Sequence, residues 1–533
     1  MTQIELILTP EEAAKPNLNE LLKARAAREL KIKPEKIAFL KKIRRSIDAR
    51  SRQIKVLFLV EVHTEGEPEP EPDFKSFLKP LFKSPENDLL KSNVRKAIIV
   101  GAGPAGYFAA LELLEHGIKP IVFDRGKDVR ERRKDLRAIQ QFGIVNPHSN
   151  YCFGEGGAGT YSDGKLYTRS VKRGDVFKSL KILVEHGATS DILLDAHPHI
   201  GSNKLPKVVS AIRETILENG GEVHFDSHVT DFILADKKIL GVVVNGETEH
   251  FGDAVILATG HSARDIFELL LKRNIYIEAK PFAMGVRIEH PQALIDEAQY
   301  RQNPRSEHLP ASSYKHVCQV DSRGVFSFCM CPGGLIVPAA TAPGEIVVNG
   351  MSMSRRDSEF ANSGIVVAVN LEDLEPFKAH GAFAGLEFQK SVEQGVFKAN
   401  GDGSQRAPAQ RMTDFVAGKI SPTLRETSYI PGLVSAPVHE VLPEYISKRL
   451  RVAFVEFGKK MRGYYTEEAN VVATESRTSS PIKIPRVKET LMHTEIENLF
   501  PCGEGAGYAG GIISAAMDGQ NVAKAVALKV NAG

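Results

Sequence analysis

The sequence predicts an α/β protein built on a Rossmann-like dinucleotide-binding domain, and three observations within residues 94–126 lead to this prediction. A predicted strand, residues 94–100, leads directly into the glycine pattern Gly101-Ala-Gly-Pro-Ala-Gly106. A helical segment follows over residues 107–116, and a second apolar run ends at Asp124. Strand, glycine turn, helix and acid-terminated strand make a complete βαβ unit, which predicts a parallel sheet.

Each glycine of the turn has its own physical reason. Gly101 permits the tight turn out of the strand, Gly103 lets backbone N–H groups approach a pyrophosphate, and Gly106 lets the helix pack on the strand. The helix that follows points its positive end at the phosphates. Asp124 is spaced to accept a hydrogen bond from a ribose hydroxyl. The predicted cofactor-binding residues of this unit are Gly101, Gly103, Pro104, Ala105, Gly106, Asp124 and Arg125.

Composition limits the class and the compartment. A chain of 533 residues predicts two to four domains, and 42% hydrophobic with 25% charged residues excludes a wholly disordered or fibrous chain. The formal charge of +3 gives no global electrostatic reason to expect nucleic acid or a membrane. No apolar run approaches the roughly 18 residues of a membrane span. The N-terminus lacks a secretory pattern and the five cysteines are irregularly spaced, so we expect a cytoplasmic protein without a structural metal site.

The first 64 residues predict a small α+β module, followed by a proline-rich acidic linker at 65–93. We expect strands at 4–8 and 54–62 and a helix at 18–30. Residues 15–55 hold 14 basic and 4 acidic side chains. This stretch is either a face for nucleic acid or a solvated helix surface. We favour the solvated helix surface because Phe39 is its only aromatic residue.

Two distant segments resemble the fingerprints of flavoproteins with the glutathione-reductase type of FAD domain. Residues 253–260 read as a strand ending in Ala-Thr-Gly, and residues 499–507 as a strand followed by Gly-Glu-Gly. In the family an Asp stands at the position of Glu504. A helix opening at Gly510 would face the flavin ring, where its dipole stabilises negative charge. The resemblance implies FAD as cofactor and adds as binding residues Ala258, Thr259, Gly260, Gly503, Glu504, Gly510, Gly511 and Ile512.

Several loops together resemble a family of bacterial FAD-dependent dehydrogenases, distantly similar to the flavoproteins that include fumarate reductases. These loops are residues 153–166, 259–265, 328–334, 349–352 and 505–511. The resemblance implies an FAD-binding domain in two parts, 94–270 and 441–533, with a mixed α+β cap or substrate domain at 271–440. The glycine-rich loop at 154–165 can pass close to the cofactor unless it is a mobile surface loop. It adds Gly157, Ser162, Asp163 and Lys165 as candidate binding residues.

The candidates for catalysis lie near these fingerprints. A histidine has a pKa near neutrality and suits proton transfer, although His261 could equally cap a helix. Basic side chains could clamp a carboxylate substrate. The predicted catalytic residues are His261, Arg264, Lys483 and Arg486.

Two further patterns favour structural readings. Cys329 and Cys331 form a CxC pair, for which we favour packing over redox chemistry, because a disulfide between them would be strained in an extended strand. His197 and His199 resemble a metal pair, but the neighbouring sequence offers no further ligands.

The function predicted is an FAD-dependent oxidoreductase that transfers a hydride between flavin N5 and a small-molecule substrate. There is no second complete βαβ unit with a GxGxxG turn for NAD(P), so NAD(P)H is expected only as a transient electron donor. Two alternatives stay open. One is an FAD-dependent RNA-modifying or RNA-binding protein that uses the basic N-terminal module, and the other is a non-catalytic flavin-binding scaffold.

Overall fold

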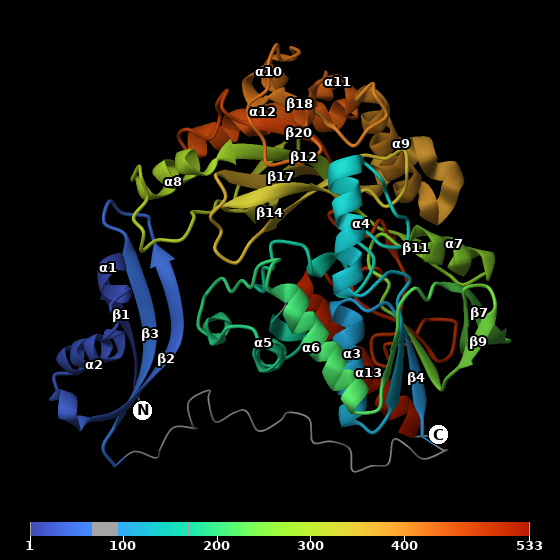
Figure 1. Cartoon of the computed structure of the whole chain (residues 1–533), viewed down its shortest axis with the longest axis horizontal. Coiled ribbons are helices and arrows are strands. Elements are labelled where there is room, and N and C mark those ends of the chain that lie inside the picture. Colours follow the sequence, from blue (N-terminus) through green and yellow to red (C-terminus); the bar gives the residue numbers. More distant parts are fainter. Residues whose placement is uncertain (1, 67–93, 169–170, 532–533) are drawn as a thin grey trace.

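The computed structural model describes residues 2–66, 94–168 and 171–531. Figure 1 shows three parts: an N-terminal unit, a domain with a parallel sheet, and a cap that lies above that domain. The predicted linker lies outside the described residues from residue 67 onward. Among the described residues, no helix has the length and apolar character needed to cross a membrane.

The parallel sheet confirms the α/β fold class. Its five strands run in the order β22-β10-β4-β5-β6, and every pair is parallel. The central strands are almost wholly buried, as their unbroken apolar runs require. The predicted βαβ unit is present, with α3 (Pro104–Glu115) crossing from β4 to β5. The strands are β4 (Lys96–Val100), β5 (Lys119–Phe123), β6 (Glu222–His224), β10 (Ala254–Leu257) and β22 (Leu499–Pro501).

Helices and a small antiparallel sheet surround this parallel sheet. The C-terminal helix α13 (Ile512–Asn531) packs along α3, and both are buried over much of their length. The antiparallel meander is formed by β7 (Val229–Ala235), β8 (Lys238–Val244) and β9 (Thr248–Phe251). The other helices of this part are α4 (Val129–Phe142), α5 (Val176–Glu185), α6 (Leu205–Glu218) and α7 (Arg264–Lys272).

The cap is a seven-stranded sheet in the order β13-β14-β17-β12-β20-β18-β19. The predicted boundary at residue 440 falls inside this domain and is corrected. The apolar face of helix α12 (Glu444–Lys460) packs into the same core as the sheet, and β20 pairs with β12. The strands are β12 (Phe282–Pro291), β13 (Val317–Val320), β14 (Arg323–Cys331), β17 (Phe360–Val369), β18 (Ala407–Arg411), β19 (Leu433–Ser435) and β20 (Asn470–Glu475).

The cap also contains a hairpin and several helices, and a short two-stranded sheet joins it to the parallel-sheet domain. The hairpin is β15 (Gly334–Pro338) with β16 (Val348–Ser352), and the short sheet is β11 (Glu278–Ala279) with β21 (Ile482–Lys483). The helices are α8 (Gln292–Tyr300), α9 (Ala384–Ala399), α10 (Met412–Ala417), α11 (Val438–Val441) and α12 (Glu444–Lys460).

The N-terminal unit is a three-stranded antiparallel sheet with its own apolar core. The strands β1 (Thr2–Leu8) and β3 (Lys55–Thr64) and the helix α2 (Leu18–Glu29) lie where the sequence placed them. The short helix α1 (Pro10–Ala13) follows β1. The reading of the basic stretch as a helix surface is wrong over its second half. Residues 37–48 form strand β2 (Ile37–Asp48), an edge strand that carries Lys41, Lys42, Arg44 and Arg45.

Candidate active site

The parallel-sheet domain and the cap enclose a cavity of about 340 Å³. Its walls come from the carboxyl ends of β4, β5 and β10, the first turns of α3 and α13, the loop at 153–165, and the end of β14 in the cap. Most of the predicted site residues line it: Gly101, Gly103, Pro104, Ala105, Asp124, Arg125, Gly157, Ser162, Asp163, Lys165, Ala258, Thr259, Gly260, His261, Glu504, Gly510, Gly511 and Ile512.

The three glycines of the first turn have different surroundings. A Cβ on Gly101, whose φ is +109°, would lie 2.4 Å from the carbonyl oxygen of Ala258. A Cβ on Gly106 would lie 1.9 Å from the carbonyl oxygen of Gly101. These two glycines are required by the fold itself, and Gly106 is not part of the cavity wall. A Cβ on Gly103 would meet only the Cα of Gly157, at 3.9 Å, so Gly103 borders open space.

Donor groups face the cavity from two helix ends and one side chain. Gly103 is the N-cap of α3 and provides no side-chain cap, so the first N–H groups of α3 have no partner from the cap. The N-terminus of α13 also reaches the cavity through Gly511 and Ile512. The Oγ1 atom of Thr259 is buried without a hydrogen-bond partner. A polar ligand would satisfy these groups.

Asp124 has a structural duty that the sequence did not reveal. Its Oδ2 accepts a hydrogen bond from the N–H of Ala102 at 2.8 Å. Its Oδ1 accepts from the N–H groups of Gly126 at 2.8 Å and Gly154 at 3.1 Å. The carboxylate therefore ties the first glycine turn to the glycine-rich loop. Oδ2 keeps a free lone pair for a ligand hydroxyl, because a carboxylate oxygen can accept two hydrogen bonds.

The glycine-rich loop is anchored and is not a mobile surface loop. Asp163 is buried and pairs with Arg356 at 2.9 Å and Lys165 at 3.5 Å. Its carboxylate also accepts a hydrogen bond from the hydroxyl of Ser352. The Ser162 hydroxyl donates to the carbonyl of Gly159 at 2.8 Å. The loop thus joins the first domain to hairpin β15–β16 of the cap.

His261 and Glu504 form a titratable pair in the cavity wall. His261 Nδ1 lies 3.7 Å from Glu504 Oε2. Burial, helped by the charge of Arg477, lowers the pKa of His261 to about 4. Burial raises the pKa of Glu504 to about 7, although Lys280 opposes the shift. Near neutral pH the histidine is therefore uncharged, and the carboxyl group can hold or release a proton.

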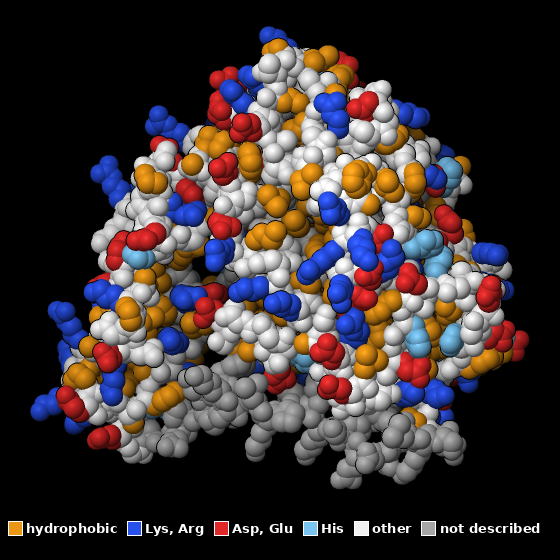
Figure 2. All heavy atoms as spheres, in the orientation of Figure 1, with side chains coloured by type: hydrophobic (Ala, Val, Ile, Leu, Met, Phe, Trp, Pro, Cys, Tyr) orange, Lys and Arg blue, Asp and Glu red, His pale blue; other side chains and the backbone are white. Residues whose placement is uncertain are grey.

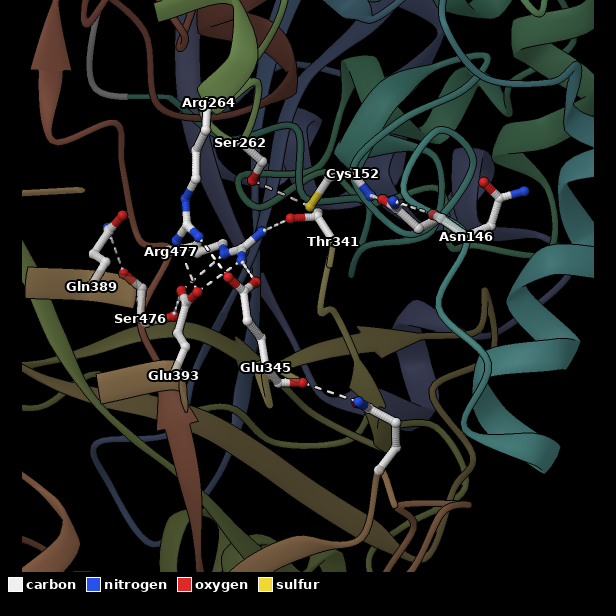
Figure 3. Close-up of polar contacts among 12 residues, drawn as sticks. Asn146, Cys152, Ser262, Arg264, Thr341, Glu345, Gln389, Glu393, Ser476 and Arg477 are labelled. Carbon is white, nitrogen blue, oxygen red and sulfur yellow. Dashed lines mark hydrogen bonds and ion pairs between the residues drawn. The ribbon is translucent and has the colours of Figure 1, made fainter. Parts of the chain in front are cut away.

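Arg264 does not reach the cavity, because it belongs to a buried cluster of ion pairs (Figure 3). Its guanidinium donates to Glu345 and Glu393, each at 2.8 Å. Arg477 binds the same two carboxylates at 2.8 Å and also donates to Thr341 Oγ1 at 2.6 Å. Burial raises the pKa of Glu393, but Arg264 and Arg477 outweigh it and hold that pKa well below its usual range. Arg477 touches the cavity wall, so this cluster supports the wall from behind.

The structure also places Lys483 and Arg486 outside the cavity lining. Lys483 is a partly exposed residue that pairs with Glu278 across β11 and β21. Arg486 makes two hydrogen bonds to the carboxylate of Asp518 and lies over the ring of Tyr508. Both side chains hold elements together. Gly503 likewise does not line the cavity, but its N–H donates to Asp518 at 2.7 Å.

Arg125 lines the cavity but is already paired. Its guanidinium contacts Asp265 at 2.6 Å and lies 4.5 Å from the centroid of the Phe153 ring.

Several residues of the cavity wall were not predicted from the sequence. Phe328, Cys329 and Asn349 come from the cap, and Tyr167 lies just after the glycine-rich loop. The signal that could have found the first three was their place in unusual short motifs. Among the described residues, no group of three or more His, Cys, Asp or Glu side chains could hold a metal ion.

Two family models match parts of the chain. Residues 281–478 match the family model described as FAD-dependent protein, C-terminal domain-like, and residues 1–63 match a domain of unknown function. An uncharacterised protein of Clostridium beijerinckii is 41% identical over 520 residues, which cover 95% of both chains.

Solved structures are much more distant. A flavin-dependent brominase, Bmp2, is 12% identical with a TM-score of 0.35, over 82% of this chain and 81% of that one. A geranylgeranyl bacteriochlorophyll reductase-like protein of Thermoplasma acidophilum is 13% identical with a TM-score of 0.33, over 82% and 80% of the two chains. With TM-scores below 0.5, these likenesses carry no inference about this chain.

Proposed function

The chain belongs to the same family as the Clostridium beijerinckii protein, and from this premise we propose that it is an FAD-dependent oxidoreductase acting on a small molecule. The cavity is the observation that carries the proposal. Two glycine loops meet there at Gly103 and Gly157, next to the uncapped first turn of α3 and the unpartnered hydroxyl of Thr259. The cap closes the cavity, and its residues 281–478 match the family model described as FAD-dependent protein, C-terminal domain-like.

The residues of the cavity fit a dinucleotide. The N–H groups at the start of α3 would bind the pyrophosphate, because a helix N-terminus with glycine at its cap accepts an anion closely. The free lone pair of Asp124 would accept a ribose hydroxyl. The N-terminus of α13, from Ile512, would stabilise negative charge on the flavin ring. When bound, FAD supplies the hydride-transfer chemistry, which no side chain of the cavity can supply.

The protein would supply a proton and exclude water. Glu504 faces the cavity with a pKa of about 7 and can give a proton to a substrate or take one from it. His261 is uncharged near neutral pH and so can accept a hydrogen bond without adding positive charge. The cap residues Phe328 and Asn349 form part of the cavity wall and would keep water from the bound cofactor.

The experiment is a titration of FAD-free protein with FAD, followed by the flavin spectrum. In Gly103→Ala the new methyl group meets only Gly157 within the chain, so the fold should keep its stability. The same methyl would stand where the pyrophosphate approaches, so we expect FAD affinity to fall at least tenfold, which is about 1.4 kcal/mol. Gly324→Ala is the matched control, because its methyl meets only the Gln319 side chain at 3.9 Å, far from the cavity lining.

Wild-type protein that purifies colourless and takes up no added FAD would overturn the proposal. Equal FAD affinity in Gly103→Ala and wild type would show that the cofactor does not lie against this turn. Bound flavin that no small-molecule donor reduces, in a screen run without oxygen, would favour the scaffold alternative instead.

A further inference from the structure

The CxC motif sits at a bulge in the cap sheet. The register of β14 on β17 shifts between Phe328 and Cys331, so the strand carries one extra residue there. Cys329 has a φ of +44°, which is not an extended conformation. A CxC disulfide is strained when the backbone between the two cysteines is extended, and here the backbone at Cys329 is not extended. The bulge therefore removes the objection to a bond between the two sulfurs.

The two cysteines have different surroundings. Cys329 is half-buried and lines the cavity, whereas Cys331 is fully buried directly behind it. The Cys331 thiol lies 3.3 Å from the carbonyl oxygen of Cys329. One guanidinium nitrogen of Arg287 contacts both residues, at 2.6 Å from the Cys329 carbonyl oxygen and 3.7 Å from Cys331 Sγ. Cys329 thus borders the cavity, whereas Cys331 is covered by protein and is close enough to Cys329 to react with it.

Charges around the motif favour a thiolate on the outer sulfur. A hydrogen bond from the Cys331 side chain, together with the nearby charges of Lys165 and Arg287, lowers the pKa of Cys329 to about 6, against burial and the charge of Asp163. Burial raises the pKa of Cys331. The other acids influenced by Cys329 are Glu475 and Glu504, and each has its pKa raised to about 7, mainly by burial. The thiolate is the nucleophilic form of cysteine.

We propose that Cys329 and Cys331 are a redox-active pair in the cavity wall, which cycles between dithiol and disulfide and takes a small disulfide as substrate. This inference rests on the proposed FAD site. Cys329 is the attacking sulfur because it faces the cavity, and Cys331 is the resolving sulfur because it lies buried behind it.

The exchange balances between the substrate disulfide, the two cysteines and reduced FAD, and NAD(P)H is the class of donor that would reduce the flavin for each turnover. The Cys329 thiolate attacks a disulfide R–S–S–R, forms a mixed disulfide and expels one thiolate R–S⁻. Cys331 then attacks Cys329, so the Cys329–Cys331 bond forms and the second R–S leaves, taking the Cys331 proton as R–SH. Two electrons and one proton, which bound reduced FAD would supply, would return the pair to one thiolate and one thiol.

The test uses the full chain, first without FAD, and the aromatic disulfide 5,5′-dithiobis(2-nitrobenzoate) as probe. We expect wild type to release two thionitrobenzoate ions per chain in the fast phase, with a Cys329–Cys331 disulfide in the peptide mass spectrum. C331S should release one and keep the probe on Cys329, and C329S should lose the fast phase. C318S, on strand β13, is the control and should behave as wild type.

A lasting probe adduct on wild-type Cys329, or a fast phase that survives in C329S, would overturn the proposal. The second arm uses FAD-loaded protein with its flavin reduced without oxygen. The probe should reoxidise the flavin at least tenfold faster in wild type than in C329S, and equal rates would refute exchange with the cofactor. Because the first arm needs no FAD, failure of the cysteine pair and failure of the FAD site give different results.

Discussion

Single residues show which sequence signals carried physical information about the site. Gly103 borders the cavity because its backbone must be approached, and that requirement is visible in the sequence as a glycine in a fixed pattern. Arg486 was an equally plausible catalytic residue from the sequence, yet its guanidinium forms an ion pair with Asp518. The sequence cannot reveal such a pairing, because the partner lies 32 residues away and meets it only through the fold.

The raised pKa of Glu504 predicts a pH-dependent stability. Burial is the main cause, because it favours the neutral carboxyl in the folded protein and raises the pKa from its usual 4.5 to about 7. The stabilisation is therefore present below pH 4.5 and is lost as pH rises through 7. We expect Glu504→Gln to gain about 2 kcal/mol relative to wild type between pH 5 and pH 8, measured by urea unfolding. A constant difference between the two proteins would show that Glu504 does not titrate in this range.

At the scale of elements, the crossing of α3 and α13 fixes the floor of the cavity. A Cβ on Gly519 would lie 2.1 Å from the carbonyl oxygen of Ala105, so the two helices touch through backbone. We expect Gly519→Ala to push α13 off α3, lower the free energy of unfolding by about 1–3 kcal/mol and weaken FAD binding. Gly395→Ala in α9, where the methyl meets nothing within 4 Å, should not destabilise the protein. Unchanged stability in Gly519→Ala would contradict this packing.

The ion-pair cluster behind the cavity joins α7, α9 and the segment after β20. Arg264→Ala would leave the buried carboxylates of Glu345 and Glu393 with Arg477 as their remaining arginine partner (Figure 3). Breaking a buried pair from one side costs about 3–5 kcal/mol. We expect a loss of that size in chemical unfolding, whereas Lys459→Ala, which removes an exposed pair with Glu456, should change stability by less than about 1 kcal/mol. A small loss in Arg264→Ala would mean that water replaces the arginine.

Some helices and strands could be predicted from the sequence, and others could not. The apolar runs of β4 and β10 were readable because both faces of a parallel strand are buried. Strand β2 was missed because its adjacent lysines and arginines break the apolar alternation expected of a strand, and because its pairing with β3 is a tertiary contact. The extent of the cap was misjudged for the same reason, since α12 belongs to it only through the core that it shares with the sheet.

On the scale of the whole molecule, the N-terminal unit meets the other two parts at few points. A hollow of about 1130 Å³ lies between them, and a gap at this place is visible in Figure 2. Arg45 of β2 forms the main polar contact, with its side chain 2.7 Å from Asp195. Its backbone exchanges hydrogen bonds with Leu194 and Ala196. Ile54 adds a small apolar contact with Tyr300 and Leu309 of the cap region.

This arrangement predicts that the contact can be loosened without unfolding either side. Arg45→Ala removes the ion pair with Asp195, and we expect the amide of Ala196, which donates to the Arg45 carbonyl at 2.9 Å, to exchange its hydrogen at least fivefold faster. The free energy of global unfolding should fall by no more than about 1 kcal/mol, because the pair is partly exposed. The exposed neighbour Arg44, changed to Ala, is the control and should leave Ala196 protected. A loss of unfolding free energy several times larger than this would contradict the prediction. It would show that the N-terminal unit unfolds together with the rest of the protein, and that its own core of β1, β3 and α2 does not keep it folded alone.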